Sequence, residues 1–164
     1  KQETNQEILE SEEKESETKS TQYIGKGGEY RVISELLFKG FNANVMSVDH
    51  GIDIIATKND KLYNIQVKTA NEKYGKYVSD MNINSYQKHN SSNTYYIFVL
   101  RGKNINFLIL PFVEAQKNID QKNILIVDNA KRYRANITLR DGRIYLGKLS
   151  NDVTYYNNNW DLIK

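Results

Sequence analysis

The spacing of apolar residues predicts one amphipathic helix near the start of the chain. Apolar pairs at 32–33 and 36–37 recur at intervals of three and four residues, which is the period of one helical face. Gly25 opens this stretch and Gly40 closes it, so we expect a helix of about four turns between them.

After this helix the apolar pattern changes to that of strands. Segments 43–46, 52–57 and 62–69 are short, rich in Ile and Val, and separated by turn residues, which predicts three consecutive strands. The later segments predict, in order, a helix near 84–90, strands at 94–100 and 105–111, a helix at 111–119, a strand at 124–128 and a hairpin turning at Asp141-Gly142.

The first 22 residues have a different composition from the rest of the chain. They contain a dense run of Glu and almost no large apolar side chains, so they cannot bury enough surface to fold alone. We therefore expect an acidic, disordered tail or linker at 1–22 and one folded domain at 23–164. A helical form joined to something upstream stays open, as does a missing upstream domain, because residue 1 is Lys rather than Met.

Composition narrows the chemistry. The chain has 164 residues, 39% of them hydrophobic, no Cys and two His. Such a length suits one compact domain, and the absence of Cys excludes disulfides, thiol nucleophiles and Cys-containing zinc sites. Any metal would need oxygen ligands, which favours magnesium, manganese or calcium.

The charge is unevenly distributed. Residues 1–20 contain seven acids and three bases, which gives them a net charge of −4. Because the whole chain has a net charge of +3, the remaining residues carry a net charge of +7. A basic domain suits a polyanionic partner such as DNA, although an ordinary solvated basic surface is the alternative. No long apolar run or secretory leader is present, so we expect a cytoplasmic protein.

Strand register places three polar side chains together. A turn at Asn59-Asp60 pairs positions whose numbers sum to 119, so Asp53 faces Gln66. Directly opposed side chains are rooted about 4.5–5.5 Å apart, close enough to hold one divalent ion. Lys68 lies on the same face as Gln66 because side chains alternate along a strand.

Glu29 is predicted to point inward from the helix. It precedes the apolar pairs at 32–33 and 36–37 by three, four, seven and eight positions, which places it on the buried stripe. An unpaired carboxylate there would be costly. Glu29 therefore needs a cation or a metal near the sheet, whereas Glu35 falls on the solvated side.

These residue types suit phosphodiester hydrolysis. Carboxylate and amide oxygens can hold a metal that polarises a phosphate, and a lysine can stabilise the charge that develops. The segments GGEYRV, GIDIIA and IQVKT resemble the signature of the PD-(D/E)XK nuclease superfamily in its Gln-x-Lys form. The resemblance spans roughly 25–111. It is greatest to group I intron-associated homing endonucleases, and more distant to Holliday junction resolvases and Mrr-like restriction enzymes.

The resemblance implies a fold and a set of roles. It implies an α/β, restriction-endonuclease-like core in α-β-β-β-α-β order, with a central mixed sheet flanked by helices. It also implies an endonuclease that cuts DNA with Mg²⁺ or Mn²⁺, and a homodimer that addresses two strands. Asp53 would be the main metal ligand, Gln66 would replace the usual Glu or Asp, Lys68 would be catalytic, and Glu29 would assist.

Two departures from the family pattern matter. Ile52 stands before the aspartate in place of proline, and neutral Gln66 should weaken metal affinity. The alternative is therefore a catalytically silent nuclease-like module that binds DNA or protein, including the C-terminal part of a larger regulator or toxin.

Further basic and aromatic residues are candidates for nucleic-acid contact. Four lysines flank the site in sequence and would contact the DNA backbone, although each alone is more often an ordinary surface lysine: Lys26, Lys73, Lys76 and Lys88. Tyr74 and Tyr77 suit core packing better than base stacking. We expect His50 to be a loop residue. We expect the glycines at 25, 27 and 28 to form a flexible entry to the helix.

Overall fold

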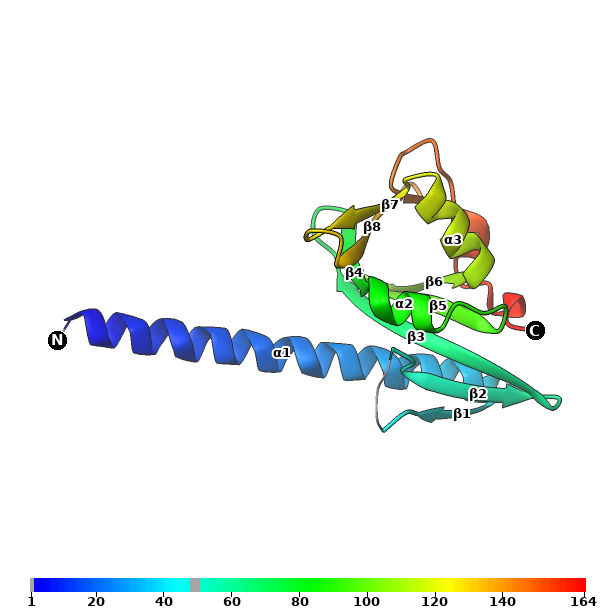
Figure 1. The fold of residues 1–164 in the computed structure, drawn as a ribbon, viewed down its shortest axis with the longest axis horizontal. Coiled ribbons are helices and arrows are strands. Elements are labelled where there is room, and N and C mark those ends of the chain that lie inside the picture. Colours follow the sequence, from blue (N-terminus) through cyan, green and yellow to red (C-terminus); the bar gives the residue numbers. More distant parts are fainter. Residues whose placement is uncertain (1, 48–50) are drawn as a thin grey trace.

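The computed structural model describes residues 2–47 and 51–164 (Figure 1). In chain order its elements are α1 (Gln2–Phe38), β1 (Asn42–Val45), β2 (Ile54–Lys58), β3 (Lys61–Asn71), β4 (Lys76–Asn82), α2 (Ile83–Lys88), β5 (Thr94–Arg101), β6 (Ile105–Pro111), α3 (Phe112–Asp120), β7 (Ile124–Val127), β8 (Arg132–Arg140), β9 (Arg143–Leu146), η1 (Thr154–Tyr156) and η2 (Trp160–Leu162). Among the described helices, none combines the length and apolar character that crossing a membrane requires.

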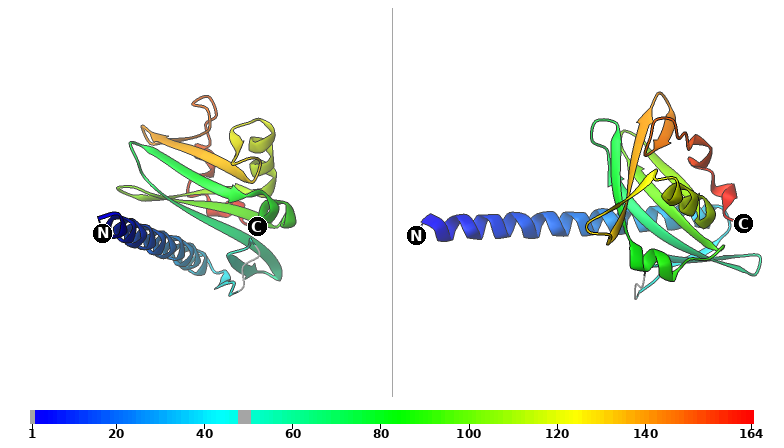
Figure 2. Two further views of the ribbon diagram at one scale, coloured as in Figure 1. Left: turned by 60° about the vertical axis from the view of Figure 1, so that its left-hand side comes forward. Right: turned by 45° about the horizontal axis from the view of Figure 1, so that its top comes forward.

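The central sheet is mixed, as expected. Its strand order is β1-β2-β3-β5-β6. Strands β3 and β5 are parallel, and the other neighbours are antiparallel. Helix α1 lies along one face, and a second sheet with α2 and α3 covers the other (Figure 2). The prediction of an α/β domain with a mixed sheet flanked by helices is confirmed.

The predicted hairpin register is also confirmed. Every β2–β3 pair, from Ile54 with Ile65 to Lys58 with Lys61, has residue numbers that sum to 119. The connection is the two-residue turn at Asn59 and Asp60, with φ angles of 51° and 60°. Asn and Asp tolerate this left-handed conformation, which matches the twist of a tight hairpin. The hairpin at Asp141-Gly142, between β8 and β9, follows the same rule.

The central sheet is buried on both faces because its strands alternate between two cores. In β5, the side chains at 95, 97 and 99 pack toward α1 together with Val32 and Leu36. Those at 96, 98 and 100 pack toward the second sheet, beside Tyr86 of α2. Each fully buried large apolar side chain contributes about 1.5–3 kcal/mol, so these two layers hold β3 and β5 rigidly in place.

The second sheet, by contrast, is predicted only in part: the sequence predicts β7 and the β8–β9 hairpin, but neither β4 nor their grouping into a separate sheet. It has the order β4-β8-β7, with β9 paired to β8. Strand β4 occupies the stretch that the sequence pattern leaves irregular, and it buries Tyr77 and Met81 as a strand. Its alternation is weak because Ser79 is buried while Val78 is exposed. Tyr77 packs in the core, as expected, whereas Tyr74 is almost fully exposed in the turn before β4.

Helix α1 is longer than predicted. It runs without interruption from Gln2 to Phe38, and its N-terminal half projects beyond the sheets (Figure 1). The predicted helix start at Gly25 is wrong, and residues 2–22 are helical where the sequence predicts a disordered tail. Glu, Lys and Gln are good helix formers, and Thr18 and Thr21 add hydrogen bonds to backbone carbonyls one turn earlier.

The glycines inside α1 have a packing reason instead. A Cβ atom at Gly28 would overlap the Oγ1 atom of Thr69 on β3, whereas Gly27 has open space. Gly28 therefore lets α1 approach β3 closely, which positions the next residue, Glu29, against the sheet.

Candidate active site

A hollow of about 410 Å³ lies between α1 and the C-terminal end of β3. Three of the predicted site residues line it: Glu29 from α1, Asp53 from the segment before β2, and Lys68 from β3. Its remaining lining residues are Thr21, Ile24, Gly25, Val67, Thr69 and Asn71. Helix and hairpin thus bring two carboxylates and one ammonium group to a common opening.

Asp53 is held where β2 and β3 separate. Its backbone N–H donates to the carbonyl of Ile65 at 3.0 Å, one residue short of the Gln66 partner that the regular register would give. One carboxylate oxygen, Oδ2, accepts the N–H of Val67 at 2.6 Å. Because β2 no longer pairs with β3 at this point, the carboxylate satisfies a backbone donor of β3. This bond fixes the carboxylate beside Gln66 and Lys68.

Gly51 allows the segment before Asp53 to pass close to helix α2. Its φ angle is 100°, and a Cβ atom there would come within 2.6 Å of the Cβ of Ser85 on α2. Glycine therefore lets the chain pass close to α2 two residues before Asp53. His50, which the sequence assigns to a loop, lies outside the described residues.

Glu29 finds the cation that its buried position requires. It is 9% exposed, and its Oε2 atom accepts a hydrogen bond from Lys26 Nζ at 2.7 Å. This hydrogen bond raises the pKa of Lys26, and the negative charges of Glu29 and Asp53 raise it further. Lys26 therefore lies within electrostatic reach of both carboxylates.

Gln66, the fourth predicted site residue, does not line this hollow, but it has an unpaired acceptor nearby on β3. Its side chain is 4% exposed, and its Oε1 atom has no hydrogen-bond partner among the described residues. A buried acceptor without a partner costs about 1–3 kcal/mol, so it is a place where a bound ligand would be stabilising. The buried Oγ1 of Thr69, which lines the hollow, is in the same condition.

Lys68 is half-buried at the edge of the hollow. Within the part of the chain that the structure describes, it forms no ion pair. Its charge is therefore available to an anion that enters the hollow.

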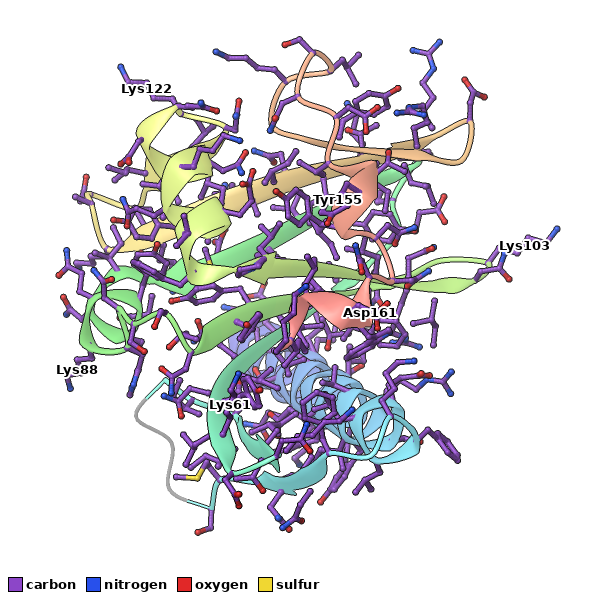
Figure 3. All side chains as sticks on the ribbon, turned by 90° about the vertical axis from the view of Figure 1, so that its right-hand side faces the viewer. Lys61, Lys88, Lys103, Lys122, Tyr155 and Asp161 are labelled. Carbon is purple, nitrogen blue, oxygen red and sulfur yellow. The ribbon has the colours of Figure 1, made fainter. Side chains whose placement is uncertain are left out.

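Of the four lysines predicted to contact DNA, Lys26 contacts a residue of this site, because it donates to Glu29, although it does not line the hollow itself. Lys73 and Lys76 hydrogen-bond to each other through their backbones in the turn after β3. Lys88 lies in the last turn of α2 and is exposed (Figure 3). These three do not line the hollow.

Thr69 and the Lys26–Glu29 pair are absent from the sequence-based list of site contacts. Thr69 follows Lys68 directly, but strand alternation places it on the other face and gives no sign that it would line the hollow. The i,i+3 spacing of Lys26 and Glu29 is the one local signal that predicts their pairing.

The chain is similar to known proteins in its structure, whereas comparison of its sequence with family models and curated proteins finds no match. No protein-family model matches the chain, and no curated protein matches it. Among solved structures, it is similar to the bacterial homing endonuclease I-Ssp6803I, with a TM-score of 0.60 and 18% identity over 87% of this chain and 90% of that one. The chain therefore has a restriction-endonuclease-like fold.

A second solved structure gives a weaker match. Hjc, a Holliday junction resolvase from Archaeoglobus fulgidus, matches with a TM-score of 0.46 and 15% identity, over 67% of this chain and 81% of that one. In the restriction-endonuclease-like fold of the present chain, the hollow lies where β2 leaves β3.

The donors at this point fit a hard divalent cation. Glu29 and Asp53 supply carboxylate oxygens, and Gln66 supplies an amide oxygen that has no other partner in the described structure. Mg²⁺ typically takes one or two carboxylates and keeps several waters. No group of three or more His, Cys, Asp or Glu residues suited to a metal occurs in the described residues. Gln66 does not line the hollow itself, so its amide is a candidate third ligand only through its neighbouring position on β3.

Proposed function

We propose that this domain is a divalent-metal-dependent endodeoxyribonuclease that hydrolyses phosphodiester bonds of DNA. The observation that carries the proposal is the common hollow of Glu29, Asp53 and Lys68. Gln66, two residues before Lys68 on β3, adds a buried Oε1 atom that has no partner among the described residues. The similarity to a homing endonuclease is in fold and supports the same class of reaction.

Each residue has a distinct role in the proposal. Asp53, Gln66 and Glu29 would hold Mg²⁺ or Mn²⁺. When bound, this ion supplies Lewis-acid polarisation of the scissile phosphate and makes a nearby water more acidic. Lys68 donates to a phosphate oxygen and stabilises the negative charge that develops during attack. Lys26 holds the Glu29 carboxylate toward the sheet and limits the repulsion between the two acids.

Substitution of Lys68 by Ala tests the proposal. The experiment incubates supercoiled plasmid and a synthetic four-way junction with magnesium, manganese or chelator, using the wild type and Lys68→Ala. We expect metal-dependent cutting by the wild type and a loss of about 10²–10³ in rate in the variant, the typical effect of removing one electrostatic stabiliser. Lys103→Ala, at an exposed site between β5 and β6, is the matched control.

Unchanged cutting by Lys68→Ala, with the fold verified by circular dichroism, would refute the assignment. The preferred substrate, plasmid or junction, would separate the branches that share this fold. We further propose a homodimer, because a duplex presents two strands. A monomer in solution at high concentration with DNA bound would contradict that part.

A second candidate is a binding module that has lost cleavage, including one within a larger regulator or toxin. The observations that favour it are the neutral Gln66 and the Lys26–Glu29 ion pair, which together reduce the negative charge available to a cation. Titration with Mn²⁺ separates the two functions. Saturable binding that is lost in an Asp53 variant supports the enzyme, whereas DNA binding without metal binding supports the module.

A further inference from the structure

A second hollow, of about 600 Å³, lies at the N-terminal end of β3. Four lysines from separate parts of the chain line it: Lys39, Lys58, Lys61 and Lys164. Lys39 follows α1, Lys58 and Lys61 flank the β2–β3 turn, and Lys164 follows η2. Among the described residues that line this hollow, Asp161 is the one acidic side chain.

Aromatic rings and a backbone carbonyl position two of these ammonium groups. Lys58 Nζ lies 4.6 Å from the centre of the Phe41 ring and donates to the carbonyl of Lys39 at 2.7 Å. Lys39 Nζ lies 5.9 Å from the centre of the Trp160 ring. Cation–π contacts of this length are attractive, and they hold the two charges at the rim of the hollow.

The lysine charges are not neutralised within the fold. Over the described residues, none of the four forms an ion pair with a carboxylate. Like charges brought together repel, and a bound polyanion relieves that repulsion while it releases counterions. The hollow therefore favours a ligand with several negative charges.

A neighbouring hollow opens the lysine hollow along the hairpin, although it adds Asp60 and no further lysine. Another hollow of about 600 Å³ shares Lys58, Asn59 and Lys61 with the first and lies along the same hairpin turn. The aromatic side chains of the first hollow are less than a tenth exposed, so their faces are covered and do not offer platforms for base stacking. An extended polyanion, recognised through its phosphates, fits such a surface better than a small enclosed ligand.

We propose that the lysine hollow binds the phosphate groups of a nucleic-acid strand, as a second site distinct from the catalytic hollow. Lys61 and Thr69 stand at the two hollows on the same strand, about 26 Å apart by the strand rise. Naming nucleic acid as the source of the phosphates rests on the proposed function. The cationic character of the site does not.

The experiment uses the chain's single tryptophan, Trp160, which lies in the wall of the lysine hollow. A labelled single-stranded oligonucleotide is titrated in chelator, with its anisotropy and the fluorescence of Trp160 recorded at several salt concentrations. We expect saturable binding with a parallel change in Trp160 fluorescence. In the double variant Lys39→Gln/Lys61→Gln, the slope of log affinity against log salt should fall by about 1.4, at about 0.7 per phosphate contact.

The matched control is the double variant Lys103→Gln/Lys122→Gln. These exposed lysines lie at the edges of the view in which Lys61 and Asp161 are central (Figure 3). The control should keep the wild-type slope. Equal slopes in the two double variants, or oligonucleotide binding without a change at Trp160, would overturn the proposal.

A parallel titration with tripolyphosphate tests the source of the phosphates. If tripolyphosphate changes Trp160 fluorescence and the oligonucleotide does not bind, nucleic acid is refuted as the occupant. Because the titration contains no metal and involves no cleavage, its result is separate from the nuclease assay. A chain that fails to cut DNA can still confirm or refute this site.

Discussion

The two hollows at the ends of β3 are built from opposite kinds of side chain. The proposed catalytic hollow gathers the carboxylates of Glu29 and Asp53, with Lys68 at its edge. The lysine hollow gathers ammonium groups at its rim, over buried aromatic rings. The first therefore favours a cation and the second a polyanion. One nucleic-acid substrate with its metal would satisfy both, since the metal neutralises the acids and the phosphates neutralise the lysines.

The difference also lies in how firmly each site is held. Asp53 is tied to β3 by two hydrogen bonds, and Glu29 is positioned by the close approach of Gly28 to Thr69. The lysines have long flexible side chains, and within the described part of the chain the contacts that fix them are those of Lys58 and Lys39. Such a division suits a rigid site for chemistry and an adaptable one for holding a backbone.

Replacement of Asp53 by Asn should have the largest effect. The Asn side-chain oxygen can still accept the Val67 N–H, so the fold should survive while the metal loses a charged ligand. We expect cleavage to fall by at least about 10²-fold and Mn²⁺ binding to weaken, measured by plasmid assay and calorimetry. Asp141→Asn, in an exposed turn, is the control, and full cleavage by Asp53→Asn would contradict the site.

Replacement of Gly28 by Ala tests how the catalytic hollow is assembled. The new methyl group would meet Thr69 Oγ1 and push α1 away from β3, at a cost of about 1–3 kcal/mol in the free energy of unfolding. Gly27→Ala has open space and should be stabilising by up to about 1 kcal/mol through helix propensity. Urea unfolding measures both, and equal stabilities would show that the helix is not seated as described.

Replacement of Gln66 by Glu should increase the affinity of the proposed site for divalent cations and lower the stability of the metal-free protein. A third carboxylate would raise the affinity for Mn²⁺. In chelator it would lower stability, because position 66 is buried and a carboxylate there is desolvated and repelled by its acidic neighbours. Calorimetry with Mn²⁺ and thermal unfolding with and without metal test the two effects. Mn²⁺ affinity equal to that of the wild type would remove Gln66 from the proposed ligand set.

The smallest effect is expected at Asp80, which lies in neither hollow. Its carboxylate accepts two hydrogen bonds from Arg134, each of 2.8 Å, and this pairing lowers the pKa of Asp80. A group whose folded pKa is lowered adds stability that is complete above its unfolded pKa and is lost as the pH falls through the folded pKa. The pair is partly exposed, so its contribution should be about 1 kcal/mol or less.

Urea unfolding at pH 7 and at decreasing pH below 4 measures this term. Asp80→Asn should be less stable than the wild type at pH 7, and the gap should narrow as the pH falls. Binding of metal and oligonucleotide at pH 7 should be unaffected. A constant gap at all pH values would show that the charge of Asp80 is not what stabilises the pair.

Local patterns in the sequence are sufficient for the parts of the fold that depend on neighbours along the chain. Asn59-Asp60 and Asp141-Gly142 specify tight turns, and the first of them fixes the β2–β3 register, beyond which Asp53 accepts the N–H of Val67. The apolar stripe of α1 predicts that Glu29 points inward. These inferences hold because turn chemistry and side-chain alternation act over only a few residues. The catalytic roles of the four residues stay predictions.

Other features depend on where distant segments meet. Strand β4 was not predicted, because Ser79 interrupts its apolar alternation and β8, far along the chain, supplies its partner. From the sequence alone, the glycines of α1 predict a flexible helix entry. In the structure, Gly28 is needed because a side chain there would overlap Thr69 on β3. The lysine hollow joins residues near 39, 60 and 164, which no short-range pattern relates. Tertiary packing decided these features, because burial and charge at such points depend on partners that only the complete fold brings together.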